Sequence, residues 1–177
     1  KPDDVSYWDM ITGMLKSNIH KTPAKPLPHV APNFEKSDQT KIIWFGHSSY
    51  LVQVDGMNIL VDPVFSTRTS PFSFLGTKNF AGTDFIKLED IPDPDIVLIT
   101  HDHYDHLDYP SILKLKTRTK HFVTSLGVGA HLERWGVSPS AITELAWGEQ
   151  SQSLGGLIFT AAPARHFTGR GFKRNLT

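Results

Sequence analysis

The segment 101–106, which reads His-Asp-His-Tyr-Asp-His, places three imidazoles and two carboxylates within six positions. An apolar, β-branched run precedes the segment and predicts a buried strand. Because side chains alternate along an extended chain, His101 and His103 should point to the same side and offer two nitrogen ligands to one metal. Asp105 and His106 follow where the chain turns and can face a second metal beside the first. Imidazole and carboxylate ligands suit Zn, Mn or Fe(II), so the segment predicts a metal site.

The same segment also has a possible structural explanation without a metal. Histidines also occur on surfaces and as hydrogen-bonded core residues, and a single histidine here would mean little. Five ionisable groups crowded at one strand end are harder to explain without a ligand. The chain has no cysteine. That excludes disulfides, cysteine nucleophiles and thiolate metal sites, and it leaves the redox compartment undecided.

The spacing His-x-His-x-Asp-His resembles the signature of the metallo-β-lactamase superfamily. Further motifs resemble one branch of it, the N-acylphosphatidylethanolamine phospholipase D group and its bacterial relatives, with the L-ascorbate-6-phosphate lactonase group as a more distant cousin. The resemblance runs from about residue 41 to the end. The flanking motifs that carry it are Trp-Phe-Gly-His-Ser-Ser at 44–49, Val-Asp-Pro-Val-Phe at 61–65, Ser-Pro-Phe-Ser-Phe at 70–74, Leu-Gly-Val-Gly at 126–129, Trp-Gly-Glu at 147–149 and Ala-Arg-His-Phe-Thr-Gly-Arg-Gly at 164–171.

The resemblance implies an α/β fold, the metallo-β-lactamase-like αββα sandwich, with two divalent metal ions, Zn foremost and Mn or Fe as alternatives. His101, His103 and a later strand-end histidine would bind the first metal. His166 fits that role, 60 residues after His106, although it could also be an ordinary loop histidine. Asp105 and His106 would bind the second metal, and Asp105 would also act in catalysis by orienting the nucleophile.

The family pattern also requires a bridging aspartate and a last histidine beyond the His166 position. The sequence ends at Thr177, which is before either could occur. We therefore expect a fragment of a longer protein, which holds the first half of the sandwich and the start of the second. The rest of the site would come from the remaining C-terminal portion or from a homo-oligomer.

Four further residues are candidates near the site. Asp62 ends a strand before a proline and could orient a ligand histidine through a hydrogen bond, or it could be a turn aspartate. His47 is expected to make a hydrogen bond near the site without binding metal, because the family's ligand set is complete without it. Arg165 and Arg170 flank His166 and could bind a substrate phosphate, with a solvated loop as the alternative.

The chain divides into an N-terminal arm over 1–40 and a hydrolase domain over 41–177. The arm holds a short amphipathic helix near Trp8, followed by a proline-rich extended segment. In the domain we expect long loops over 66–94 and a mixed sheet with helices packed outside. Strands are expected at 41–45, 50–54, 57–61, 95–100, 121–124, 142–145, 152–154 and 157–160, with helices after Asp108 and over 127–135.

The implied function is metal-dependent hydrolysis by a metal-bound hydroxide, with a phospholipase D-like phosphodiesterase preferred. A lactonase or other ester hydrolase of the same fold and a non-catalytic metal-binding fragment are the alternatives. Lys plus Arg and Asp plus Glu both number 18, so no net charge favours nucleic acid. A small-molecule or phospholipid substrate is expected, with contact to a membrane surface through the N-terminal helix as an alternative to packing on the body. The expected location is cytoplasmic or membrane-associated.

Overall fold

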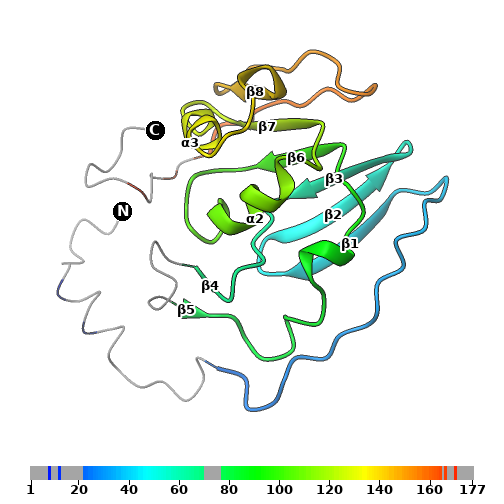
Figure 1. Cartoon of the computed structure of the whole chain (residues 1–177), viewed down its shortest axis with the longest axis vertical. Coiled ribbons are helices and arrows are strands. Elements are labelled where there is room, and N and C mark those ends of the chain that lie inside the picture. Colours follow the sequence, from blue (N-terminus) through cyan, green and yellow to red (C-terminus); the bar gives the residue numbers. More distant parts are fainter. Residues whose placement is uncertain are drawn as a thin grey trace.

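A computed structural model describes Trp8, Thr12, residues 22–69, residues 77–164, His166 and Arg170. Its main element is a six-stranded mixed sheet, traced in Figure 1. Three antiparallel strands are followed by three parallel ones. The strand order is β1 (Lys41–Gly46), β2 (Ser49–Val54), β3 (Met57–Val61), β6 (Ile96–Ile99), β7 (His121–Ser125) and β8 (Ile142–Leu145).

The antiparallel part forms because strand-favouring runs are separated by tight turns. Asp55 and Gly56 join β2 to β3, and both have positive φ angles, of 49° and 72°. Two consecutive left-handed residues make the turn whose twist matches a hairpin. Along β2 burial alternates, so Leu51 and Gln53 face the interior while Val52 and Val54 are half-buried. The hairpin predicted from the sequence is therefore present.

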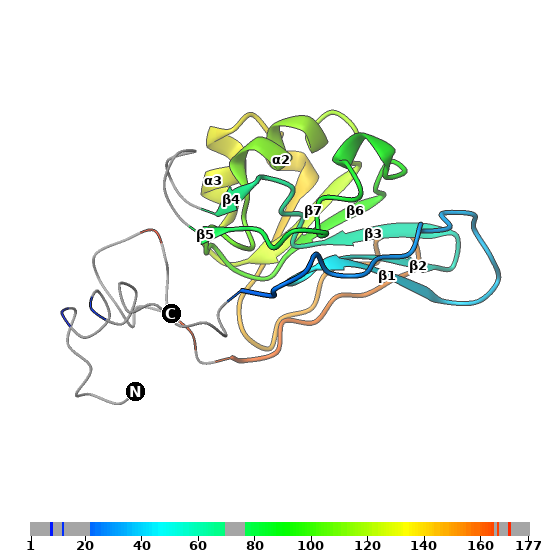
Figure 2. The same cartoon turned by 90° about the horizontal axis from the view of Figure 1, so that it is seen from below.

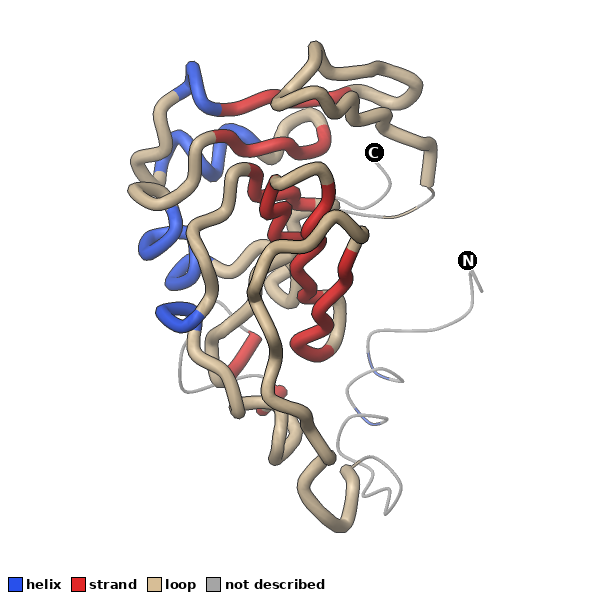
Figure 3. The backbone as a smooth tube through the Cα atoms, turned by 90° about the vertical axis from the view of Figure 1, so that its right-hand side faces the viewer, coloured by secondary structure: helices blue, strands red, loops and turns tan. Residues whose placement is uncertain are grey.

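The helices lie on one face of the sheet, as Figures 2 and 3 show from two directions. They are α2 (Tyr109–Leu115) and α3 (Gly129–Arg134), with short 3-10 turns η1 (Leu88–Asp90) and η2 (Pro139–Ala141). Their apolar residues pack against the sheet in one continuous core, which includes Leu51, Leu60, Val97, Ile112, Leu115, Phe122 and Leu132. One α/β layer of the predicted sandwich is thus built.

A second, smaller core covers the opposite face of the sheet. Ile59, Val61, Ile96, Val123 and Leu145 project there, and Leu154, Leu157, Phe159 and Ala161 pack over them. In Figure 2 the segment of 146–164 runs along this face. Among the described residues no helix covers it, so the two faces of the sheet are closed by different kinds of structure.

Several boundaries differ from the sequence-based expectation. The strands expected at 152–154 and 157–160 are only isolated bridges, Gln150 to Thr160 and Leu154 to Leu157. The pair Gly155-Gly156 turns the chain immediately after Leu154 and leaves no room for a ladder. Within the expected loops of 66–94, β4 (Arg68–Thr69) pairs with β5 (Thr77–Lys78), and η1 contributes Leu88 to the core.

The expected cap of α2 is also different in detail. Asp108 occupies the N-cap position, but its carboxylate accepts no bond from the backbone of the helix. Its Oδ2 instead accepts hydrogen bonds from the hydroxyls of Ser66 at 2.9 Å and Ser111 at 2.5 Å. Asp108 therefore ties the loop after β3 to the helix, and Pro110 lies in the first turn as predicted.

The N-terminal arm can be followed only in part. Most of the expected helix near Trp8 lies outside the described residues. Residues 22–40 contain no helix or strand, as the prolines predict, and they contact the body through Leu27 N–H, which donates to Ala81 O at 2.8 Å. No helix in the described part of the chain has the length and apolar character needed to cross a bilayer.

The strand order brings the candidate site residues to one edge of the sheet. Strands β3, β6 and β7 are parallel, so their carboxyl ends meet at the same edge. Asp62 follows β3 directly, and the segment 101–106 follows β6 after Thr100. Ligand sites in open α/β sheets form at such edges.

Candidate metal centre

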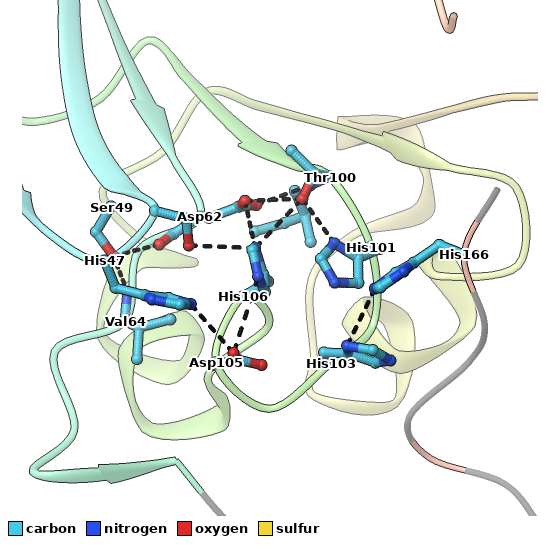
Figure 4. A network of polar contacts seen from close by, with 12 residues as sticks. His47, Ser49, Asp62, Val64, Thr100, His101, His103, Asp105, His106 and His166 are labelled. Atoms are coloured by element: carbon cyan, nitrogen blue, oxygen red, sulfur yellow. Dashed lines mark hydrogen bonds and ion pairs between the residues drawn. The ribbon is translucent and has the colours of Figure 1, made fainter. Parts of the chain in front are cut away.

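Three histidines converge at the carboxyl end of β6. His101 and His103 come from the loop after the strand, and His166 reaches them from the C-terminal segment (Figure 4). Nε2 of His166 lies 3.2 Å from Nδ1 of His103, and the ring centroids of His101 and His166 are 4.5 Å apart. One nitrogen of each residue lies within 4.8 Å of the other two. The structure thus brings together the three residues assigned to the first metal.

A second group lies beside the first. Oδ2 of Asp105 is 3.1 Å from Nε2 of His47 and 4.0 Å from Nε2 of His106. These three donors also lie within 4.8 Å of one another. The rings of His101 and His106 are 3.9 Å apart between centroids, so the two groups are neighbours (Figure 4). The arrangement offers nitrogen and oxygen donors to two adjacent cations.

The chemistry of His101 fits a metal ligand. Its Nε2 is buried and, among the described residues, has no hydrogen-bond partner. Leaving a buried ring nitrogen unsatisfied costs free energy that a bound cation would recover. Burial, reinforced by the nearby His106, His103 and His166, lowers the pKa of His101 from 6.5 to about 4. The ring therefore stays in the neutral form that binds metals.

This pKa predicts a pH-dependent stability for the metal-free protein. Because the unfolded chain binds the His101 proton near pH 6.5 and the folded chain only near 4, acidification through that window favours unfolding. We expect the free energy of unfolding to fall from pH 6.5 to 4 more steeply in wild type than in His101→Asn. Urea unfolding of both proteins in chelator, at half-unit pH steps, measures this difference. Equal slopes would contradict the depressed pKa.

Asp62 contacts the second group through His106. Its side chain is buried, and Oδ2 lies 2.7 Å from Nδ1 of His106. Oδ1 accepts a hydrogen bond from the N–H of Thr100 at 2.8 Å, and Oδ2 accepts one from its hydroxyl at 2.7 Å. With Nδ1 engaged by the carboxylate, Nε2 of His106 is directed toward Asp105. The contact required for the predicted orienting role is therefore present.

Ser49 and Thr100 support Asp62, and sequence reasoning missed both. Asp62 has a positive φ of 41°, which is unfavourable for a residue with a side chain. The hydroxyl of Ser49 donates to Asp62 O at 2.6 Å and accepts from the N–H of Val64 at 3.1 Å, which holds the chain at that corner. The only sequence signal was that Thr100 directly precedes the metal motif and Ser49 lies in the conspicuous 44–49 motif.

The comparisons with known proteins agree with this geometry. A sequence model described as the beta-lactamase superfamily domain matches residues 57–177, which is more than half of the chain. The chain belongs to the beta-lactamase superfamily. The fold class expected from the sequence is thereby confirmed, as a mixed α/β sheet of the metallo-β-lactamase type.

The chain is similar to proteins from several organisms. An uncharacterised protein of Mycobacterium tuberculosis is 41% identical over 173 residues, or 96% of this chain and 45% of its own length. A Caenorhabditis elegans protein named N-acyl-phosphatidylethanolamine-hydrolyzing phospholipase D 1 is 35% identical over 150 residues, or 80% of this chain and 42% of its own. A solved metallo hydrolase from Ignicoccus hospitalis superposes with a TM-score of 0.53 at 25% identity, over 76% of this chain and 53% of its own.

The chain spans about half the length of these relatives. The segment 101–106 falls within residues 57–177 that the superfamily model matches, so the superfamily signature is carried by residues that the structure describes. His47, Asp62, His101, His103, Asp105, His106 and His166 all gather at one site of this superfamily fold.

Arg170 contacts the loop after β6, which carries His101 and His103. Its Nε donates to Asp102 O at 2.5 Å, and its Nη2 donates to Leu107 O. The guanidinium stacks 4.2 Å from the ring centroid of Tyr104 and 5.4 Å from that of Trp135. These contacts support the loop that carries the histidines. Phosphate binding by Arg170 stays a prediction, and Arg165 lies outside the described residues.

The two roles of Arg170 make different predictions. If the guanidinium supports the loop, Arg170→Met should lower the free energy of unfolding by about 2 to 3 kcal/mol, because charged hydrogen bonds to buried carbonyls are lost. It should also weaken metal binding. Thermal unfolding of the metal-free protein and a metal titration test this, with Arg134→Met as the control. Unchanged stability with a raised KM for a phosphate substrate would instead favour phosphate binding.

An apolar cavity opens beside the histidines. Its volume is about 1240 Å³, and both His101 and His166 contribute to its wall. Most of the remaining wall is apolar, formed by Leu98, Val123, Leu126, Val128, Leu145, Trp147 and Phe159 among others. The side chains of Leu126 and Trp147 are more than half exposed. An apolar group of a bound molecule could therefore lie next to the first metal group.

Proposed function

We propose that the protein acts as a metal-dependent hydrolase that cleaves phosphodiesters, with a phospholipid as the class of substrate. The observation that carries the proposal is the pair of adjacent donor groups at the carboxyl end of β6, one of three histidines and one of His47, Asp105 and His106. Paired sites of this kind serve hydrolytic displacement at phosphorus. The names of the Caenorhabditis elegans and Ignicoccus hospitalis relatives support hydrolysis, and the former supports a phospholipid.

Residues of this chain have distinct parts in that reaction. Divalent metals held by the two donor groups would supply Lewis acidity, which would lower the pKa of bound water and neutralise charge on the phosphate. The carboxylate of Asp105 lies next to His47 and His106, with Oδ2 as the oxygen that would bind the metal. Its other oxygen would hold the proton of the attacking water. An oxygen–phosphorus bond then forms, the bond from phosphorus to the leaving alcohol oxygen breaks, and that oxygen takes up the proton.

The cavity suits the lipid part of the substrate. Its apolar wall, from Leu98 and Val123 to Phe159, could take acyl carbons while the phosphate lies against His101 and His166. The exposed Leu126 and Trp147 support contact with a lipid surface. The equal numbers of basic and acidic residues give no support for nucleic acid.

The test is a substrate panel on metal-loaded protein. The panel contains bis-p-nitrophenyl phosphate, N-acylphosphatidylethanolamine in mixed micelles and a set of lactones. We expect cleavage of the phosphodiesters, with a loss of about 100-fold or more in kcat for Asp105→Asn at comparable metal content and none for the control His29→Asn. Cleavage of lactones alone would replace the proposal with the ester-hydrolase alternative. No turnover by a fully loaded protein would favour metal binding without catalysis.

A further inference from the structure

We propose that His47 is a direct ligand of the metal that Asp105 and His106 hold. The ligand set implied by the superfamily resemblance is complete without this residue, and its expected role was only a hydrogen bond. The structure places it in the second donor group, at the turn between β1 and β2 (Figure 4). That turn belongs to a different part of the sheet from the loop that carries the other ligands.

The distances agree with shared coordination. Two ligands that each lie about 2.1 Å from one metal are separated by roughly 3 Å at right angles and about 4 Å when nearly opposite. Nε2 of His47 lies 3.1 Å from Oδ2 of Asp105, and Nε2 of His106 lies 4.0 Å from the same oxygen. Both separations fall in this range, and all three donors lie within 4.8 Å of one another, so they are close enough to share one cation.

The available nitrogens also agree. Nδ1 of His106 contacts the buried Asp62, which leaves Nε2 for the metal. His47 presents Nε2 to Asp105, and the rings of His47 and His106 meet edge to face, with centroids 5.4 Å apart. Both imidazoles thus direct the same kind of nitrogen toward one carboxylate oxygen.

A hydrogen bond alone is a weak reason for this placement. The side chains of His47 and Asp105 are 62% and 42% exposed, and an exposed ion pair contributes little to stability. Yet His47 has a φ of 46°, in the left-handed region that is uncommon for residues other than glycine. The indole N–H of Trp44 donates to His47 O at 3.0 Å and holds the turn in this form. Strain that positions one exposed side chain is typical of a ligand-binding residue.

The experiment is a cobalt(II) titration of the full chain in a His103→Ala background, which disables the first group so that the signal reports on the second. Absorption and X-ray absorption spectra then give the affinity and the number of bound imidazoles. We expect His47→Ala to weaken binding more than about 10-fold and to remove one imidazole from the coordination sphere. The matched control His29→Ala should change neither value.

Two further measurements separate ligation from hydrogen bonding and from misfolding. His47→Gln can still donate a hydrogen bond to Asp105 but is a poor metal ligand, so it should bind cobalt as weakly as His47→Ala. Wild-type affinity in His47→Gln, or an unchanged imidazole count in His47→Ala, would overturn the proposal. Added imidazole should restore binding in His47→Gly if the fold is intact, and failure of that rescue in a variant with a wild-type circular dichroism spectrum would also count against it. No readout depends on hydrolysis, so the outcome is independent of the proposed function.

Discussion

His101→Ala should abolish tight binding at the three-histidine group and lower phosphodiester hydrolysis by about a thousandfold or more. His101 is central to the site, since its ring lies 3.9 to 4.6 Å from those of His103, His106 and His166 between centroids. The loss of one metal removes several kcal/mol of transition-state stabilisation, and each 1.36 kcal/mol is about tenfold in rate.

The measurement pairs initial rates with metal content on the same samples. His29→Ala, which removes an exposed histidine outside both donor groups, is the matched control and should leave both unchanged. The interpretation of the site would be wrong if His101→Ala kept the wild-type metal content, or if it lost the metal and still hydrolysed the substrate at the wild-type rate.

Asp62→Ala should lower the free energy of unfolding by about 3 to 5 kcal/mol and weaken metal binding by about 10- to 100-fold. The side chain is 1% exposed, and its carboxylate binds the backbone and hydroxyl of Thr100 as well as His106. Truncation leaves these polar groups buried without their partner. Urea unfolding of the metal-free protein and a zinc titration measure the two losses.

Asp62→Asn separates these two losses. An amide keeps the shape and can still bond to Thr100, so the variant should be more stable than Asp62→Ala. Its N–H₂ would donate to Nδ1 of His106 and fix the proton on Nε2, which is the nitrogen needed by the metal. Metal binding should therefore fall even though the fold survives. Asp38→Asn is the control, and wild-type affinity in Asp62→Asn would contradict the orienting role.

The sequence predicted well what depends on local pattern. Hydrophobic alternation and the Asp55-Gly56 turn predicted the β2–β3 hairpin, and the apolar run before His101 predicted β6. The same logic failed at 152–160, because apolar residues that cover a sheet face can do so from an irregular segment. Periodicity reports which side chains are buried and does not report whether their backbone pairs.

The parts of the site that depend on tertiary structure could not be predicted. His47 meets Asp105 only because β3 is the strand that pairs with β6, which brings the β1–β2 turn to the same edge. The guanidinium of Arg170 could bind phosphate, and its sequence position suggested this role. In the folded chain it instead contacts the carbonyls of Asp102 and Leu107, which come close to it only when the loop after β6 has folded. For His47 and for Arg170, the residue type limits the possible roles. Which partners each side chain contacts depends on the fold.

The most direct measurement is the metal content per chain by elemental mass spectrometry, after loading with zinc and removal of the excess. We expect up to two ions in wild type, about one fewer in His101→Ala, and a wild-type value in His29→Ala. A wild-type chain that retains no metal, or a content that is the same in all three proteins, would contradict the assignment of this histidine and aspartate cluster as a metal centre.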